Sequence, residues 1–137
     1  MTRAQSGQTL VVFTIVTAFV LLATIALVGN TQVLFVNADR ADAAALLSAQ
    51  AGASAIQLGA LYQDQILLAP DLATQRCEQA GAAHPSVVSV TCHVDGNTVT
   101  AHVVRRVQMP LPLWSTFETV TATRSARPAY GGATGGF

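Results

Sequence analysis

The sequence LVVFTIVTAFVLLATIALV, at residues 10–28, is an apolar run without a single charged side chain. Its nineteen residues would reach about 28 Å as a helix that rises 1.5 Å per residue, which matches the hydrocarbon core of a bilayer. The only polar members are Thr14, Thr17 and Thr24, whose hydroxyls can hydrogen-bond to carbonyl groups of their own helix. The run predicts a transmembrane helix at residues 10–28, preceded by a short cytoplasmic leader at residues 1–9.

The charges that flank this run indicate its orientation. Arg3 precedes it, whereas Asp39 and Arg40 follow about ten residues beyond it and cancel each other. The positive-inside rule then favours a cytoplasmic N-terminus and a C-terminal domain outside. A cleaved secretory signal is the alternative, but its apolar core would span only about 7–15 residues and end at a small-residue cleavage site. The run is longer and lacks such a site, so a retained single-pass anchor is favoured.

The composition restricts the class of protein. Hydrophobic residues make up 51% of the chain, charged residues 10%, and the net charge is zero, so no basic surface for nucleic acid is expected. There is no glycine-rich phosphate loop, no G-x-S-x-G and no pair of carboxylates with an accompanying base, so we expect no enzyme, no cofactor and no small-molecule substrate. His84, His93 and His102 lack a further ligand at matching spacing, so no metal site is expected.

The sequence beyond the span continues to favour helix. It is rich in Ala, Leu and Gln and contains no proline before Pro70, so the helix is expected to continue through residues 29–69 as one rod from about Thr9 to Leu68. Small residues in the span should allow close helix packing, and a stripe with steps of four and three residues should extend that packing outside. These predicted packing positions are Ala18, Ala23, Ala26 and Gly29 in the span, and Leu47, Ala51, Ser54, Leu58 and Leu61 beyond it.

A small domain is expected at residues 70–127, because about 100 residues follow the span, enough for one domain. Pro70 should end the rod and Asp71 should cap a short second helix. Cys77 on that helix and Cys92 on the following strand are expected to form a disulfide, since both lie on the outer side. It would close a loop of about sixteen residues and stabilise the domain by roughly 3 kcal/mol.

Strand signals follow this helix. Val90, Cys92 and Val94 alternate with polar residues, and the Asp95–Asn97 turn predicts a hairpin because Gly and Asn tolerate positive φ. Its return strand should place Val99, Ala101 and Val103 opposite the same face. A third strand is expected at TFETVTATR, residues 116–124, and the glycine-rich tail at residues 128–137 is expected to be mobile. The predicted fold is α+β, with a three- to four-stranded antiparallel sheet.

Two further clusters leave alternatives open. The four arginines near the end of the domain could face lipid headgroups or an acidic neighbour, or could simply be solvated strand ends; they are Arg105, Arg106, Arg124 and Arg127. The proline loop with Leu111, Leu113 and Trp114 could cap the core of the sheet or form an exposed contact.

Three segments resemble one family when they are taken in this order. Residues 6–13, SGQTLVVF, resemble the N-terminus of TadE- and TadG-like proteins of the Tad (Flp) pilus system, and residues 37–46, NADRADAAAL, are similar to the Ala-rich stretch that follows their membrane segment. The strands and proline loop of residues 99–128 are similar to their usual ending. The resemblance implies a type IV pilin-like, structural protein of the bacterial inner membrane, whose partners are lipid and other pilin-like or Tad assembly subunits.

One position departs from this pattern. Counting from Gly7, the fifth following residue is Val12, where processed pilins and TadE carry a glutamate that is thought to pair with a neighbour's N-terminal amine. The departure favours a TadG-like minor or assembly-associated subunit that keeps its leader. Cleavage between Gly7 and Gln8, giving a polymerised filament subunit made of copies of this chain, is the alternative. A membrane-tethered module that binds an extracellular ligand through Trp114 is a third.

Overall fold

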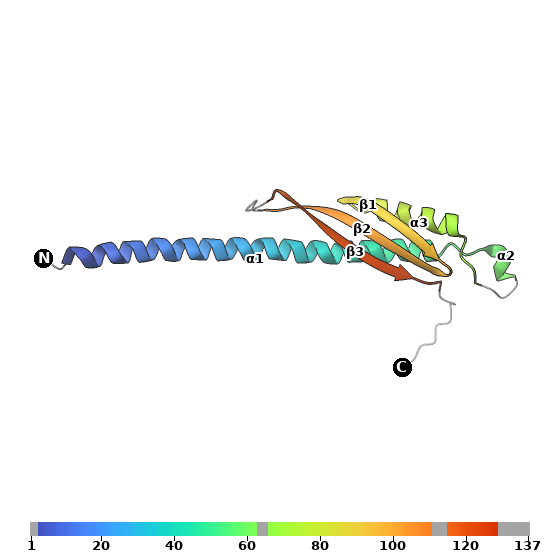
Figure 1. The fold of residues 1–137 in the computed structure, drawn as a ribbon, viewed down its shortest axis with the longest axis horizontal. Helices are drawn as coiled ribbons and strands as arrows, with labels where there is room; N and C mark the ends of the chain where they lie inside the picture. The colour runs from blue at the N-terminus through green and yellow to red at the C-terminus, as the bar shows by residue number, and fades with distance from the viewer. Residues whose placement is uncertain (1–2, 63–65, 111–114, 129–137) are drawn as a thin grey trace, which may run out of the picture.

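A computed structural model describes residues 3–62, 66–110 and 115–128, with the side chains of residues 3–6 left undescribed. The chain forms a long straight helix whose C-terminal half carries a small sheet and a shorter helix (Figure 1). The elements in chain order are α1 (Arg3–Ala53), α2 (Leu58–Leu61), α3 (Pro70–Ala82), β1 (Val87–Asp95), β2 (Thr98–Gln108) and β3 (Phe117–Ala126). This confirms the predicted α+β fold, with three strands in the sheet.

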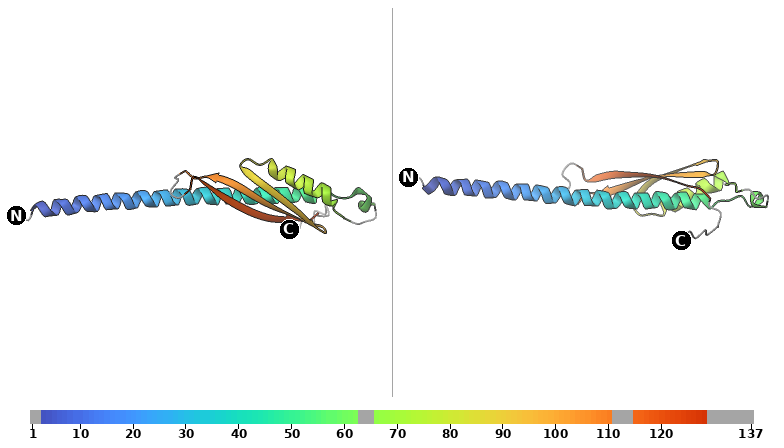
Figure 2. Two further views of the ribbon diagram at one scale, coloured as in Figure 1. Left: turned by 45° about the horizontal axis from the view of Figure 1, so that its top comes forward. Right: turned by 90° about the horizontal axis from the view of Figure 1, so that it is seen from below.

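The N-terminal half of α1 stands free of the rest of the protein (Figures 1 and 2). Within residues 10–28 every large apolar side chain is between 51% and 70% exposed. Thr14, Thr17 and Thr24 donate hydrogen bonds to the carbonyls four residues earlier, at 2.8–2.9 Å, so their hydroxyls are satisfied without water, as predicted. By length and composition α1 is a candidate membrane span, and none of its most apolar window is covered by the described protein.

Alanines line the buried face of the C-terminal half of α1. Ala41, Ala44, Ala45 and Ala49 are at most 1% exposed, and steps of three and four residues bring them onto one side of the helix. Their short side chains let the sheet and α3 approach the helix axis closely. The Ala-rich sequence that we interpreted only as helix-forming therefore also builds the domain interface.

The rod ends at Ala53, so its predicted continuation to Leu68 is wrong. After Ala53 the chain turns and forms an antiparallel bridge between Ile56 and Leu68. The Ala69 amide donates to the carbonyl of Ala55 at 2.9 Å, which returns the chain toward α3. Ser54–Gln57 contain no helix-breaking residue, so tertiary contacts override the local helix propensity here.

With Asp71 as its cap, the second helix was expected to begin at Leu72; α3 begins two residues earlier, at Pro70, and is capped differently. Pro70 is the first helical residue, where its fixed φ suits a helix and its missing N–H costs nothing. Ala69 occupies the N-cap position without a side-chain hydrogen bond, and Asp71 lies in the first turn. The carboxylate of Asp71 therefore complements the helix dipole rather than capping the helix as predicted.

The three strands form an antiparallel sheet in the order β1-β2-β3. Within the predicted hairpin, Cys92 pairs with Ala101 and Val94 with Val99, which confirms the predicted register. Gly96 alone adopts a positive φ in this turn, at 55°, so Asn97 does not need the conformational tolerance that we invoked for it. One face of the sheet packs on α1 and α3, and the other is exposed (Figure 2).

The core between these layers is made mainly of small residues. Val99, Val103, Cys77 and Ser48 are the largest side chains in it that are fully buried. Gly52 on α1 shows how close the layers come, because a Cβ atom there would lie 2.8 Å from Val99 Cγ1 and 2.9 Å from the carbonyl oxygen of Ala73. A core of this kind is thin, which makes covalent and polar links between the layers important.

Candidate interaction site on the long helix

Part of α1 faces away from the sheet and keeps apolar side chains exposed beyond the predicted span. Phe35 is 68% exposed, Leu46 40% and Leu47 50%. Leu47 follows the buried Ala45 by two positions, which turns it about 200° around the helix axis. Past residue 28 α1 is therefore two-sided, with one face built into the domain and the other available to a partner.

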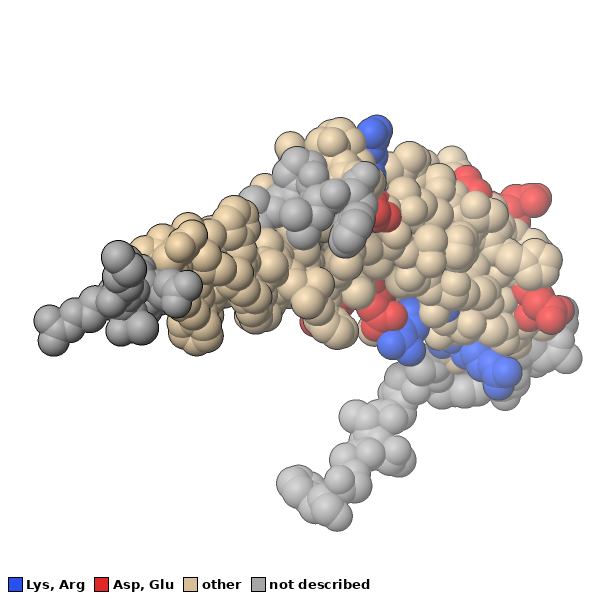
Figure 3. All heavy atoms as spheres, turned by 60° about the vertical axis from the view of Figure 1, so that its left-hand side comes forward, with Lys and Arg blue, Asp and Glu red and all other residues tan. Residues whose placement is uncertain are grey.

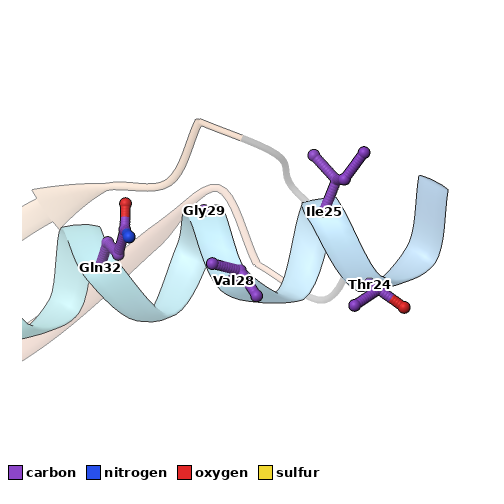
Figure 4. Close-up of a pocket in the computed structure, with 5 residues that line it drawn as sticks. All are labelled: Thr24, Ile25, Val28, Gly29 and Gln32. Carbon is purple, nitrogen blue, oxygen red and sulfur yellow. The ribbon is translucent and has the colours of Figure 1, made fainter. Parts of the chain in front are cut away.

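The predicted small-residue positions lie in the N-terminal half of α1, which the sheet does not cover. Ala18 and Ala23 are exposed, and Ala26 and Gly29 are half-buried. Gly29 and its neighbours line a shallow hollow near the end of the apolar run (Figure 4); its lining residues are Thr24, Ile25, Val28, Gly29 and Gln32. The role of these positions in helix association remains a prediction.

The proposed stripe from Leu47 to Leu61 is not a single surface. Ala51 is half-buried and Ser54 lies beyond the end of α1. Leu58 and Leu61 belong to α2, where they are 73% and 51% exposed. The predicted stripe required one continuous helix from Leu47 to Leu61, but α1 ends at Ala53.

At the other end of α1, Gly7 and Gln8, the residues on either side of the possible processing point, are helical. No described atom lies within 4 Å of where a Cβ on Gly7 would stand. Cleavage between Gly7 and Gln8 remains a prediction.

The disulfide between Cys77 and Cys92 is present, as predicted, with a Cα–Cα distance of 6.2 Å. Cys77 is fully buried on α3, and Cys92 lies on the face of β1 that packs toward it. The bond therefore fixes α3 to the sheet above α1. Its place in the core indicates a structural bond.

The four arginines do not form one basic surface. Arg124 on β3 donates two hydrogen bonds to the Asp42 carboxylate of α1, Nε to Oδ1 at 2.6 Å and an Nη to Oδ2 at 2.7 Å. This side-chain hydrogen bonding holds the pKa of Asp42 below its ordinary value and raises that of Arg124. Arg127 donates from Nε to the Thr98 hydroxyl at 3.0 Å. These two arginines therefore serve contacts within the domain.

The remaining two arginines lie on opposite faces of β2. Arg105 is only 6% exposed and faces the helix layer, and its Nε has no hydrogen-bond partner among the described residues. Arg106 is exposed on the outer face, with its guanidinium carbon 4.0 Å from the centre of the Phe117 ring. Figure 3 shows how the charged side chains gather on the domain, while the described part of the rod that projects from it is tan, without charged residues, on the face in view.

The histidines give no sign of metal binding. His93 and His102 share the exposed face of the hairpin as diagonal neighbours, since His93 pairs with Thr100 and His102 with Thr91. His102 Nδ1 lies 2.8 Å from the Thr123 hydroxyl. Across the described ranges, no three His, Cys, Asp or Glu side chains gather as a metal site would require.

Asn97 contributes a link that was not predicted from the sequence. Its side-chain amide donates to the carbonyl of Ile66 at 2.6 Å, and its Oδ1 accepts from the Leu68 amide at 3.3 Å. The hairpin turn thereby holds the segment that leads into α3. By contrast, the predicted contacts of Leu111, Leu113 and Trp114 and the expected mobility of the tail from residue 129 lie outside the described residues.

Comparison of the chain with protein-family models, with curated proteins and with solved structures finds no match in any of the three.

Proposed function

We propose that this protein is a membrane-anchored structural subunit that acts by packing its long helix against other helices. In this proposal α1 crosses the bacterial inner membrane once, with the N-terminus in the cytoplasm and the domain outside. The resemblance of residues 6–13, 37–46 and 99–128 to TadE- and TadG-like proteins suggests a minor pilin or assembly component of a Tad-type pilus or a related secretion apparatus.

The observation that carries the proposal is the two-sided character of α1. The N-terminal half exposes an apolar surface on all sides, which needs lipid or other helices around it. Past residue 28 the sheet covers one face, while Phe35, Leu46 and Leu47 stay exposed on the others. Full burial of each such side chain would contribute about 1.5–3 kcal/mol, so partners along this face would be favourable.

The same face supports one alternative. In a polymerised filament, neighbouring copies of α1 would replace the lipid around residues 10–28 and would continue along Phe35 and Leu47. That role requires release from the membrane after cleavage between Gly7 and Gln8. Mass spectrometry of sheared fibres would then find chains that begin at Gln8, whereas an anchored subunit would be found in the membrane with its leader intact.

A photo-crosslinking amino acid at Leu47 tests the proposed packing. Expressed in cells, the full-length chain should give crosslinked species larger than the monomer in the membrane fraction. The matched control is the same residue at Thr121, which is exposed on the outer face of the sheet. Crosslinks from both positions alike, or from neither, would contradict assembly through α1.

A further inference from the structure

We propose that the membrane-proximal end of the sheet docks on anionic lipid headgroups through Arg106, with Phe117 and Val88 as its apolar contacts. The inference rests on the proposed membrane insertion of α1. It assigns a second, reversible membrane contact to a domain that is otherwise tethered only through the helix.

One ion pair between β3 and α1 shows which part of α1 lies beside this end of the sheet, and therefore how far the end is from the membrane. Arg124 of β3 binds Asp42 of α1, so the two residues lie at the same level. Phe117 begins β3 seven residues earlier, which is about 23 Å along a strand and about 15 residues of a helix. A strand parallel to α1 would thus place Phe117 level with about residue 27. Because β3 is inclined to the helix (Figure 1), Phe117 is level with a somewhat later residue. Figure 1 shows the start of β3 above the same part of α1.

The predicted span ends at residue 28, so the end of the sheet lies at the lipid boundary. The headgroup layer adds about 5–7 Å on each side of the hydrocarbon core. Arg106 pairs with Thr119, two strand residues or about 7 Å farther out. The ring of Phe117 is therefore placed near the acyl boundary, and the guanidinium of Arg106 near the phosphates.

The side chains at this level suit that boundary. Phe117 is 44% exposed and Val88 63% exposed, and both line a hollow that they share with Arg106. The guanidinium of Arg106 lies over the Phe117 ring, so a cation and an apolar ring are held together on one surface. Basic side chains that bury their stem in apolar surroundings and extend their charge to headgroups are typical of membrane interfaces.

No neighbouring carboxylate in the described residues pairs with Arg106, so its charge is available to a headgroup. Glu118, at the same end of β3, accepts a hydrogen bond from the Ser115 hydroxyl and lies on the opposite face of the sheet from Arg106. Arg106 forms no ion pair among the described residues. One basic residue near an anionic surface changes the ratio of docked to undocked molecules about fivefold, equivalent to about 1 kcal/mol.

Tryptophan probes in the full-length protein test the contact. In a Trp114→Phe background, Val88→Trp places the single indole in the proposed docking surface. His93→Trp places it on the same strand but farther from the membrane. The proteins are reconstituted in vesicles of zwitterionic lipid with or without phosphatidylglycerol, using chain-brominated lipid as a quencher of the indole and acrylamide as a quencher from the water.

We expect brominated lipid to quench the Val88→Trp protein more strongly than the His93→Trp protein, and anionic lipid to increase the difference. Adding Arg106→Gln should reduce the docked-to-undocked ratio about fivefold. Equal quenching at the two positions overturns the proposal, as does indifference to anionic lipid or to Arg106→Gln. Shielding of Val88→Trp from both quenchers would also overturn it, since a protein neighbour would then cover the site. If the protein does not stay with the vesicles at all, the proposed membrane insertion fails instead.

Discussion

The close approach of α1 to α3 and β2 at Gly52 predicts that replacing this glycine by alanine destabilises the domain. The added Cβ would lie 2.8 Å from Val99 Cγ1, 2.9 Å from the Ala73 carbonyl oxygen and 3.0 Å from Cys77 Cβ. The oxygen belongs to the backbone of α3, and Cys77 is held by its disulfide. Neither can move aside alone, so the layers themselves must separate.

The magnitude follows from two opposing terms. Overpacking a tight site costs about 1–3 kcal/mol, whereas alanine gains about 0.8–1.0 kcal/mol over glycine in a helix. Because two of the three neighbours are fixed, we expect a net loss of about 1–2 kcal/mol. For a domain of this size that lowers the melting temperature by roughly 4–16 °C.

Scanning calorimetry of the full-length chain in detergent measures this change. The matched control is Gly29→Ala, in the same helix, where no described atom lies within 4 Å of the added Cβ; it should leave the melting temperature unchanged or raise it. If Gly52→Ala behaves like Gly29→Ala, the helix does not pack against α3 and β2 at this distance and the reasoning is refuted.

Three more perturbations test other links in the domain. Replacing Cys77 and Cys92 together by serine should lower the free energy of unfolding by about 3 kcal/mol, and reductant should then have no further effect on calorimetric stability, although it destabilises the native chain. Asp42→Asn should make the free energy of unfolding less sensitive to acid. Arg124 lowers the folded-state pKa of Asp42, so the pair stabilises the folded protein above the ordinary carboxyl pKa of 3.8. This stabilisation is lost as the pH falls through the lower pKa of the folded state. If acid below about pH 4 destabilises the native chain and the Asp42→Asn protein equally, the Asp42–Arg124 pair does not stabilise the domain. Asn97→Gly should keep the turn but lose two hydrogen bonds, at about 0.5–1.5 kcal/mol each, so hydrogen exchange of the segment preceding α3 should accelerate; unchanged exchange would show that the contact has no role.

The parts of the fold that were predictable from the sequence depend on local, periodic signals. The alternation of Val90, Cys92 and Val94 fixed which face of the hairpin is buried, and the turn at Gly96 then fixed the pairing with Val99. The apolar run from residue 10 to 28 required a helix whatever surrounds it. The disulfide between Cys77 and Cys92 was predicted because the expected orientation of the span places both cysteines on the outer side, where a disulfide can persist.

The parts that were missed depend on contacts between distant segments. Gly52 weakens the helix propensity just before Ala53, but no local signal sets the end of the helix there. The chain turns because Ile56 and Leu68 pair and Asn97 holds the returning segment. The pairing of Asp42 with Arg124 joins residues 82 positions apart, which no local pattern encodes. Ala41 and Leu47 both favour helix, and only the position of the sheet shows which faces the core.

Alkaline extraction of membranes from cells that express the full-length chain tests the central claim most directly, because the claim is that the uncovered apolar half of α1 lies in lipid. We predict that the chain stays in the membrane pellet at high pH and is released only by detergent. Recovery of the intact chain, with residues 10–28 present, as a monomer in the soluble fraction would contradict it.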